Sequence, residues 1–254
     1  MNDVDATEKN EPDTQNTRGG QGYFRQLRSG HDFARTDDFA REMANYVYAI
    51  GDRRTGEAVL IDPAYAPDEL LGMLAADGMH LIGVLASHYH PDHVGGDLFG
   101  HAIAGVSELL AKTDVPVHIQ KSELSYMEQI TGLGRSALVL HDSGDVVLVG
   151  GISITCIHTP GHTEGSQCFF IDDLLLTGDT LFIDGCGRLD LPGADPEEMY
   201  TSLYDRLASI AARTEVFPGH AYSPHPSSTM GSLRRTNPVL LEKTRDDWIR
   251  HYSP

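Results

Sequence analysis

Four side chains that commonly bind metal ions are crowded into one short turn. His88, His90, Asp92 and His93 follow an apolar run, residues 80–87, that is typical of a buried strand. Histidines two positions apart can project to one side of the chain and present two neutral imidazoles to one cation. The aspartate and the third histidine lie further round the turn and can face a second cation nearby. The alternative is a solvated polar turn that caps the following helix, but a helix start needs one capping group and not four.

Three later turns each add one more side chain of the ligand type. They hold His162 (Thr-Pro-Gly-His-Thr), Asp179 (Thr-Gly-Asp-Thr) and His220 (Phe-Pro-Gly-His), and each follows a strand-like run. A lone histidine beside glycine and proline is more often part of a surface loop, so each turn by itself is weak evidence. Together the four turns supply five histidines and two aspartates, which suits two metal ions. One aspartate between the ions can bridge them with one carboxylate oxygen to each.

Alternating strand-like and helix-like segments must position these turns. Strands are expected at residues 45–51, 57–62, 80–87, 115–119, 145–149, 152–158, 166–171, 173–177 and 215–217, and helices at 67–78, 106–112, 122–130, 196–212 and 237–251. Mixed strands and helices with several hairpins predict an α/β (α+β) fold in which helices cover sheets. Residues 1–22 contain almost no apolar side chains, so we expect a disordered tail there and one domain over residues 23–254.

The ligand pattern resembles that of the metallo-β-lactamase-fold superfamily. The similarity runs from about Asn45 to Pro238, and its most similar branch holds glyoxalase II-type thioester hydrolases and persulfide dioxygenases. The resemblance implies an αββα sandwich that binds two divalent metal ions, Zn²⁺ or else iron or manganese, at one edge between the sheets. In that fold metal one would be held by His88, His90 and His162, metal two by Asp92, His93 and His220, and Asp179 would bridge them.

The stretch from Gly178 to Asp190 bears on the substrate. In the enzymes that this stretch resembles, a basic residue at the position of Arg188 meets an anionic thiol carrier, commonly glutathione. A guanidinium fork binds a carboxylate with two hydrogen bonds, so the role suits arginine. The alternative is a structural ion pair between Arg188 and Asp184 or Asp190.

Other positions leave the thiol carrier open. Tyr222 could donate a hydrogen bond to the substrate, or it could simply pack within its loop. Of 254 residues only 34 follow His220, so we do not expect the helical C-terminal domain that completes the glutathione site in longer glyoxalase II enzymes. Residues 23–38 match neither family and could line the substrate pocket or an oligomer interface; the oligomeric state is left open. Another thiol is therefore as good a candidate as glutathione.

The resemblance implies a hydrolase of a small thioester or related acyl substrate, acting through hydroxide that two metal ions activate. Asp92 would orient this nucleophile and Asp179 would bridge the ions, so both are expected to be catalytic. The alternative is a persulfide dioxygenase with one Fe(II) held by His162, Asp179 and one histidine of the first turn. A lactonase or β-lactamase is less favoured, because β-lactam-opening members typically lack a carboxylate at position 179. The intact ligands disfavour a non-catalytic module that kept only the fold.

The composition excludes several other classes of protein. The chain carries 19 Lys and Arg against 37 Asp and Glu, a net charge of −18 that repels nucleic-acid phosphates and anionic lipid. No apolar run approaches the ~20 residues that span a bilayer. The three cysteines, Cys156, Cys168 and Cys186, show no zinc-knuckle spacing, and the acidic start lacks a signal-peptide pattern. We expect a cytoplasmic protein that acts on a small anionic acyl-thiol conjugate, without nucleic-acid or membrane partners.

Overall fold

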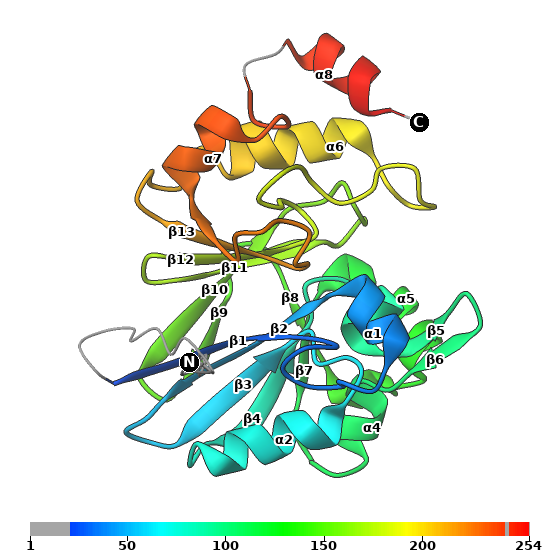
Figure 1. The fold of residues 1–254 in the computed structure, drawn as a ribbon, viewed down its shortest axis with the longest axis vertical. Helices are drawn as coiled ribbons and strands as arrows, with labels where there is room; N and C mark the ends of the chain where they lie inside the picture. The colour runs from blue at the N-terminus through cyan, green and yellow to red at the C-terminus, as the bar shows by residue number, and fades with distance from the viewer. Residues whose placement is uncertain (1–20, 242–243, 254) are drawn as a thin grey trace, which may run out of the picture.

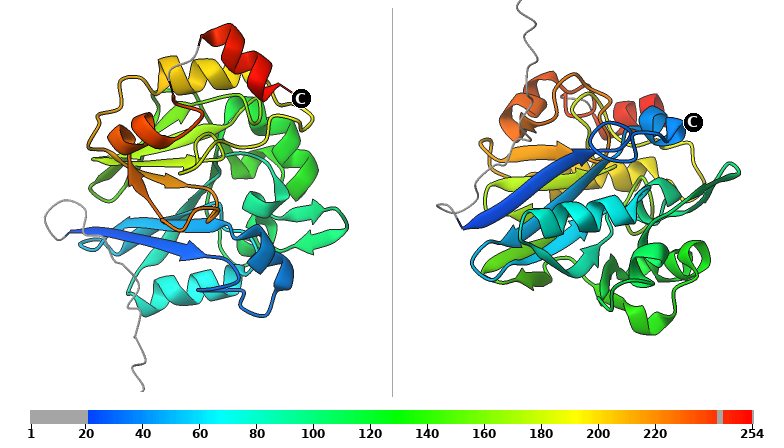
Figure 2. Two further views of the ribbon diagram at one scale, coloured as in Figure 1. Left: turned by 45° about the horizontal axis from the view of Figure 1, so that its top comes forward. Right: turned by 60° about the horizontal axis from the view of Figure 1, so that its bottom comes forward.

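The computed structural model describes residues 21–241 and 244–253. Within these residues the chain forms two six-stranded sheets packed face to face, with helices on both outer sides (Figure 1). Figure 2 shows the same layers from two further directions. The αββα sandwich predicted from the sequence is therefore confirmed. The predicted disordered tail lies outside the described residues except for Gln21 and Gly22, and Gly22 already begins a strand.

The first sheet has the strand order β1–β2–β3–β4–β7–β8. Its strands are β1 (Gly22–Arg28), β2 (Tyr46–Asp52), β3 (Glu57–Ile61), β4 (His80–Leu85), β7 (Val117–Gln120) and β8 (Leu138–His141). The first three pair antiparallel, and β3, β4, β7 and β8 run parallel. The helices that share a buried apolar cluster with this sheet are α1 (Asp38–Met43), α2 (Pro67–Ala76), α3 (Pro91–Val94), α4 (Val106–Leu110) and α5 (Leu124–Thr131).

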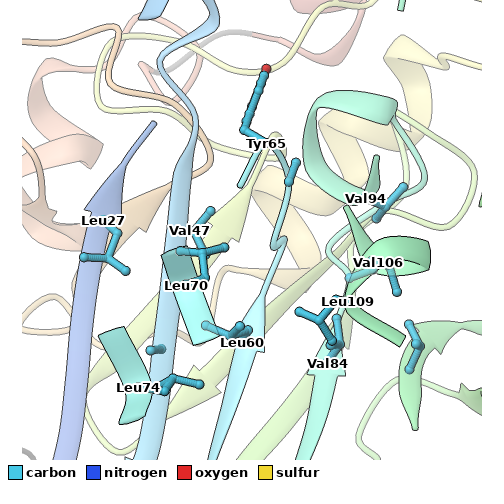
Figure 3. Packing of buried hydrophobic residues seen from close by; sticks show 14 of the residues in the cluster. Leu27, Val47, Leu60, Tyr65, Leu70, Leu74, Val84, Val94, Val106 and Leu109 are labelled. Atoms are coloured by element: carbon cyan, nitrogen blue, oxygen red, sulfur yellow. The ribbon is translucent and has the colours of Figure 1, made fainter. Parts of the chain in front are cut away.

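Helix α2 shows why this outer layer forms. It begins with Pro67, whose missing N–H group costs nothing in the first turn of a helix. Leu70 and Leu74 lie on one buried face, one turn apart. They pack in one cluster with Val47 and Leu60 of the sheet (Figure 3). Burying each leucine contributes about 1.5–3 kcal/mol, so the helix stabilises the outer face and leaves the inner face to the second sheet.

The second sheet has the strand order β14–β13–β12–β11–β10–β9. Its strands are β9 (Val146–Val149), β10 (Ile152–His158), β11 (Gln167–Ile171), β12 (Leu174–Gly178), β13 (Glu215–Pro218) and β14 (Ser228–Thr229). Only the β12–β13 pair is parallel within this described sheet. Its outer cluster includes side chains of α6 (Pro196–Thr201), α7 (Met230–Thr236) and α8 (Arg245–Tyr252), with Trp248 fully buried. Among the described residues, no helix has the length and apolar character that crossing a bilayer requires.

Strand β1 accounts for part of the region 23–38 that matched neither family. It pairs with β2 along its whole length and forms the edge of the first sheet. Tyr23 and Leu27 face the helices, whereas Phe24 faces the other sheet. The ring of Phe24 lies 4.9 Å from that of Phe217, centroid to centroid, so the strand contributes to the core between the sheets.

Two predicted helices are wrong in extent. The segment 196–212 is helical only to Thr201, followed by a π-helical turn over Ser202–Arg206. Beyond it the carbonyls of Leu207, Ala208 and Ile210 accept hydrogen bonds from the guanidinium of Arg234, which holds this non-helical segment against α7.

The predicted last helix, 237–251, contracts to α8, which Thr244 caps at its N-terminus. Asn237 instead ends α7 and joins it to the loop after β12. Its amide donates to the carbonyls of Phe182, Ile183 and Gly185. The backbone of Asn237 is extended, with φ −76° and ψ 122°, and the proline that follows disfavours a helical conformation at this residue.

Several elements, most of them short, escaped the prediction. They are β1, β8, β14, α1, α3, α7, the 3₁₀ turns at Lys121–Glu123 and Arg135–Ala137, and a hairpin of β5 (Gly96–Leu98) and β6 (His101–Ile103). Three residues are too few for an alternating pattern to be recognised. The hairpin lies directly after the first histidine turn, and its place beside the metal-type ligands is described below.

Candidate metal centre

The seven predicted ligands come from the carboxyl ends of strands in both sheets. His88 and His90 follow β4, Asp92 and His93 lie in the short helix α3 (Pro91–Val94), His162 follows β10, Asp179 follows β12 and His220 follows β13. Six of the seven are buried, and His90 is partly exposed. The structure brings all of them into three overlapping groups whose ligand atoms lie within 4.8 Å of one another.

The first group contains His88, His90 and His162. The Nδ1 atom of His90 lies 3.0 Å from the Nε2 atom of His88 and 3.0 Å from that of His162. Three ring nitrogens therefore face one point. This is the three-histidine donor set that divalent zinc favours.

The second group contains Asp92, His93 and His220. The Nε2 atoms of the two histidines are 3.3 Å apart, and Oδ2 of Asp92 lies 3.6 Å from the first and 3.4 Å from the second. One carboxylate and two imidazoles thus converge on a second point beside the first.

Asp179 lies between the two groups. Its Oδ1 is 3.4 Å from Nε2 of His93, and its Oδ2 is 3.6 Å from Nε2 of His162 and 3.4 Å from Nε2 of His220. Oδ1 is buried and has no hydrogen-bond partner among the described residues. An ionised oxygen without a donor is costly in the protein interior unless a cation accompanies it. The carboxylate is therefore suited to bridge two cations.

The outer nitrogen of four ligand rings is held by the protein. The contacts are His88 Nδ1 to Ser87 Oγ at 3.0 Å, His93 Nδ1 to Asp62 Oδ2 at 2.9 Å, His162 Nδ1 to the Arg188 carbonyl at 2.9 Å and His220 Nδ1 to the Met43 carbonyl at 2.8 Å. Such contacts fix the orientation of a ring and leave Nε2 free for a metal ion. The donor set, its bridge and these anchors together fit two divalent cations.

Local backbone features bring the turns this close. A Cβ atom added to Gly219 would lie 2.4 Å from Oδ1 of Asp179, so only glycine permits the approach of the His220 turn. Gly161, before His162, has φ +143°, and a Cβ atom added to it would collide with Met199. The glycines beside His220 and His162 are therefore required by the geometry of the site.

Burial and charge act against each other in the cluster. Burial lowers the pKa of His93, but the carboxylates of Asp92, Asp179 and Asp62 outweigh it and raise that pKa to about 10. Burial and the neighbouring histidines His93 and His90 hold the pKa of His88 well below its usual range. The cluster thus combines neutral imidazole donors with carboxylates that favour positive charge, which is the balance a cation site needs.

Sequence reasoning missed two residues that support the ligands. Asp62, at the end of β3, accepts hydrogen bonds from the N–H and the hydroxyl of Ser87 at 2.7 and 2.6 Å as well as contacting His93. Asn45 donates from Nδ2 to Oδ2 of Asp92 at 3.0 Å, and Tyr65 donates to Asn45 Oδ1 at 3.0 Å. Asp62 had a usable signal, since it is a carboxylate directly after a strand like Asp179.

A third missed residue supports the turn that holds His162. Glu123 is buried, and its Oε1 accepts from the hydroxyl of Thr163 at 2.8 Å and the N–H of Gly165 at 2.9 Å. Both donors follow His162 in its turn. Burial raises the pKa of Glu123 to about 7. No local sequence pattern marks this residue.

A cavity of about 330 Å³ opens beside the ligands. Five ligands border it: His90, Asp92, His162, Asp179 and His220. The rest of its wall is Arg188 together with apolar or aromatic side chains: Met43, Tyr89, Leu98, Phe99, Phe182, Leu191, Pro192 and Tyr222. A small organic molecule can therefore reach the two groups of ligands.

The two predicted substrate residues both border this cavity. The guanidinium of Arg188 makes a two-pronged contact with Asp190, Nε to Oδ1 at 2.8 Å and Nη2 to Oδ2 at 2.7 Å, which is the ion pair considered as the alternative. Its side chain is 64% exposed, so the ion pair is open to exchange with solvent. Tyr222 stacks on His220 with ring centroids 4.6 Å apart, and it remains 57% exposed.

A sequence model of the metallo-beta-lactamase superfamily matches residues 40–233. The chain belongs to this superfamily. The resemblance drawn from the histidine and aspartate turns is confirmed, and the protein is a hydrolase-type member of a superfamily that binds divalent metal ions.

Named relatives include the two kinds of enzyme expected from the sequence and a zinc-dependent hydrolase of polyketide biosynthesis. The chain is 32% identical over 206 residues to a probable polyketide biosynthesis zinc-dependent hydrolase, BaeB, of Bacillus velezensis, covering 81% of this chain and 86% of that protein. It is 32% identical over 201 residues to hydroxyacylglutathione hydrolase of Shewanella halifaxensis, covering 79% and 70%. It is 28% identical over 206 residues to persulfide dioxygenase ETHE1 of Bos taurus, covering 80% and 74%.

The structure of ETHE1 from Myxococcus xanthus is similar to this superfamily member over most of its length. The TM-score is 0.73 at 30% sequence identity, and the alignment covers 89% of this chain and 88% of that one.

Proposed function

We propose that this superfamily member hydrolyses a small thioester or related acyl substrate with the help of two divalent metal ions. One observation carries the proposal: Asp179 lies between two sets of three ligands and keeps a buried oxygen without a hydrogen-bond donor. That arrangement suits two cations better than one. The relative named hydroxyacylglutathione hydrolase and the relative named a zinc-dependent hydrolase support the same reaction class.

The residues that would hold the ions follow from the contacts. His88, His90 and His162 would bind the first ion, and Asp92, His93 and His220 the second. Asp179, which contacts His162 of the first group and His93 and His220 of the second, would bind both. We propose Zn²⁺, with iron or manganese as the alternatives. Two such ions lower the pKa of water toward ~7 and polarise a carbonyl group.

The protein's own groups would position the reactants. Asp92 borders the cavity, and Asn45 holds its carboxylate, so Asp92 can orient the attacking water. The water oxygen adds to the carbonyl carbon and the carbon–sulfur bond breaks, which gives a carboxylate and a thiolate. Of the two protons that the water loses, one returns to the thiolate and the other goes to solvent, so the products are a carboxylate, a thiol and a proton. A thiol has a pKa near 8.5, so the thiolate leaves readily and the reaction needs no separate general acid.

Arg188 and Tyr222 would bind the substrate. We propose that Arg188 exchanges Asp190 for a carboxylate of an anionic thiol carrier, since both partners offer the same two-pronged geometry. Tyr222, exposed at the cavity wall, would donate a hydrogen bond from its hydroxyl to the substrate.

Metal analysis and a substrate panel test the proposal. The purified protein, loaded with zinc, should bind close to two ions per chain and hydrolyse at least one member of a panel of acyl thioesters and lactones. A fully loaded protein that hydrolyses none of them would contradict the proposal.

Persulfide oxidation is a second candidate, favoured by the likeness to the two ETHE1 proteins. It requires one Fe(II), for which His162, Asp179 and one histidine of the first turn would be the ligands. The distinguishing result is one iron per chain together with oxygen uptake when a persulfide is added. Two zinc ions and no oxygen uptake favour hydrolysis.

A further inference from the structure

The cavity beside the ligands presents mostly carbon. Apart from the metal-type ligands, Arg188 is its one charged lining residue, and the guanidinium is already paired with Asp190. The remaining wall is apolar or aromatic, including Met43, Leu98 and Phe99. A polar group that moves into such a space loses its hydrogen bonds to water, which is unfavourable. The transfer of an apolar group from water into the same space is favourable.

Phe99 is highly exposed to solvent, so it contributes little to the packing of the fold. It lies at the tip of the β5–β6 hairpin, and its side chain is 84% exposed. A single exposed apolar side chain is common on a protein surface, but Phe99 is the most exposed large apolar side chain among the described residues. Nothing in the described fold covers Phe99, although it borders the cavity.

The backbone at Phe99 is unfavourable as well. Leu98 pairs with His101, so Phe99 and Gly100 form a two-residue turn, and their φ angles are +54° and +86°. Asparagine followed by glycine is the usual choice for such a turn, because a bulky side chain is strained at positive φ. A phenylalanine that is both exposed and strained indicates a function at that position.

The rest of the hairpin is held in place. The ring of His101 stacks on Phe39 with centroids 4.3 Å apart at 17°. At the other end Gly96 approaches Ile130 so closely that a Cβ atom there would lie 2.8 Å from it. Figure 1 shows the hairpin projecting from the molecule beside α5. The fold therefore presents Leu98 and Phe99 to the cavity from a fixed base.

A second cavity lies beside the first. It measures about 260 Å³, shares Phe182, Arg188, His220 and Tyr222 with the first, and adds Ile183, Asp184, Cys186 and Ser223. In the proposed reaction, a carrier that pairs with Arg188 would extend along this side. The acyl group, on the other side of the carbonyl carbon, would then extend toward the hairpin.

We propose that Phe99, together with Leu98 and Met43, forms an apolar subsite that selects thioesters with an apolar acyl group. The inference rests on the proposed hydrolysis and specifies its substrate class. The preferred acyl group is a medium-length alkyl chain or an aromatic group that fits about 330 Å³, and small polar acyl groups are poor substrates.

The test varies the acyl chain on one constant thiol. Acetyl, butyryl and hexanoyl thioesters of the same small anionic thiol are compared with the zinc-loaded protein. We expect kcat/KM to rise about fourfold per added methylene until the cavity is filled. Lengthening an alkyl thiol on a constant acetyl group should raise kcat/KM less per methylene than lengthening the acyl group, because the second cavity is smaller and includes the carboxylate of Asp184.

Phe99→Asn is the decisive variant. It should reduce the hexanoyl-to-acetyl ratio of kcat/KM at least about tenfold, because the ring that covers the chain is lost. The melting temperature should stay the same or rise, since asparagine suits the turn. Leu148→Asn is the matched control: Leu148 lies in β9, is 66% exposed and borders none of these cavities, so the ratio should not change.

The possible failures can be told apart. A flat acyl series, or a ratio that Phe99→Asn leaves unchanged, overturns the subsite while hydrolysis stands. If no thioester is hydrolysed, the proposed function fails, and calorimetry with hexanoate and acetate tests the subsite alone. Tighter binding of hexanoate that weakens in Phe99→Asn supports the subsite, and equal binding of the two carboxylates overturns it.

Discussion

Among the ligand side chains, we expect substitution of Asp179 to have the largest effect on metal binding and hydrolysis. Its carboxylate lies within 3.4–3.6 Å of His93, His162 and His220, where it can balance the charge of two neighbouring cations. Asp179→Asn keeps the shape and removes the negative charge. We expect metal content to fall from two ions toward one per chain and hydrolysis to fall by orders of magnitude, measured by elemental analysis and thioester turnover.

A matched control is available for that variant. Asp173→Asn removes the same charge from an exposed residue that pairs only with the surface side chain of Arg213 in the described ion pairs, and it should leave both readouts unchanged. Full metal content and full turnover in Asp179→Asn would contradict a two-ion site.

Substitutions at Arg188 and at its ion-pair partner Asp190 should change KM in opposite directions. Arg188→Ala should leave metal content unchanged and raise KM about tenfold for a substrate with an anionic carrier. Asp190→Asn frees the guanidinium and should lower KM for the same substrate. Steady-state kinetics with a charged and an uncharged carrier decide this. A structural ion pair alone would produce neither change in KM.

At the scale of elements, the helices and strands that could be predicted from the sequence were the longer ones with a regular apolar pattern. The β2–β3 hairpin, α2 and strands β10 to β12 have enough alternating or helical apolar residues to be expected from the sequence. The β5–β6 hairpin and β14 are too short for a pattern. The ends of the 196–212 and 237–251 segments depend on Arg234 and Asn237, whose bonds reach residues distant in sequence.

The candidate site was predictable for a related reason. Each of the seven side chains lies in the turn or short helix that follows a strand, and the structure brings all seven together. The groups that hold them were less visible. The carbonyls of Met43 and Arg188 are backbone atoms with no sequence signal, and Glu123 reaches its partners only through tertiary folding.

The parallel strands β7 and β8 give the fold a pH-dependent contact away from the metal centre. Nδ1 of His118 lies 2.8 Å from Nε2 of His141, whose other nitrogen is 3.5 Å from Asp145. Burial and His141 lower the pKa of His118 to about 4. Below pH ~6.5 the unfolded chain gains a proton at this histidine that the folded chain does not take up until about pH 4. Stability should therefore fall over this range.

His118→Gln removes this contribution. We expect urea midpoints of the variant to fall less than those of the wild type between pH 6.5 and 4.5. His80→Gln, at the exposed start of β4, is the control and should follow the wild type. Parallel curves for wild type and His118→Gln would show that this pair does not contribute to acid sensitivity.

At the scale of the whole molecule, the metal-type ligands join the two sheets. His88 and His90 extend from the first sheet, whereas His162, Asp179 and His220 extend from the second. Between the sheets the packing is apolar, with Phe24, Tyr48 and Phe217 in one cluster. The sandwich is thus held by hydrophobic burial along its length and by a polar cluster at the strand ends.

This arrangement makes metal binding a contribution to global stability. Ions that bind only the folded chain stabilise it by about 4 kcal/mol when their free concentration is 1,000 times the Kd. Removing them leaves Asp92, Asp179 and the buried histidines without the charge that balances them. We expect a chelator to lower the melting temperature cooperatively, with a single transition, and added zinc to restore it. Asp179→Asn should recover only part of that stabilisation. An unchanged melting temperature in protein shown to be metal-free would mean that the cluster does not bind the sheets together.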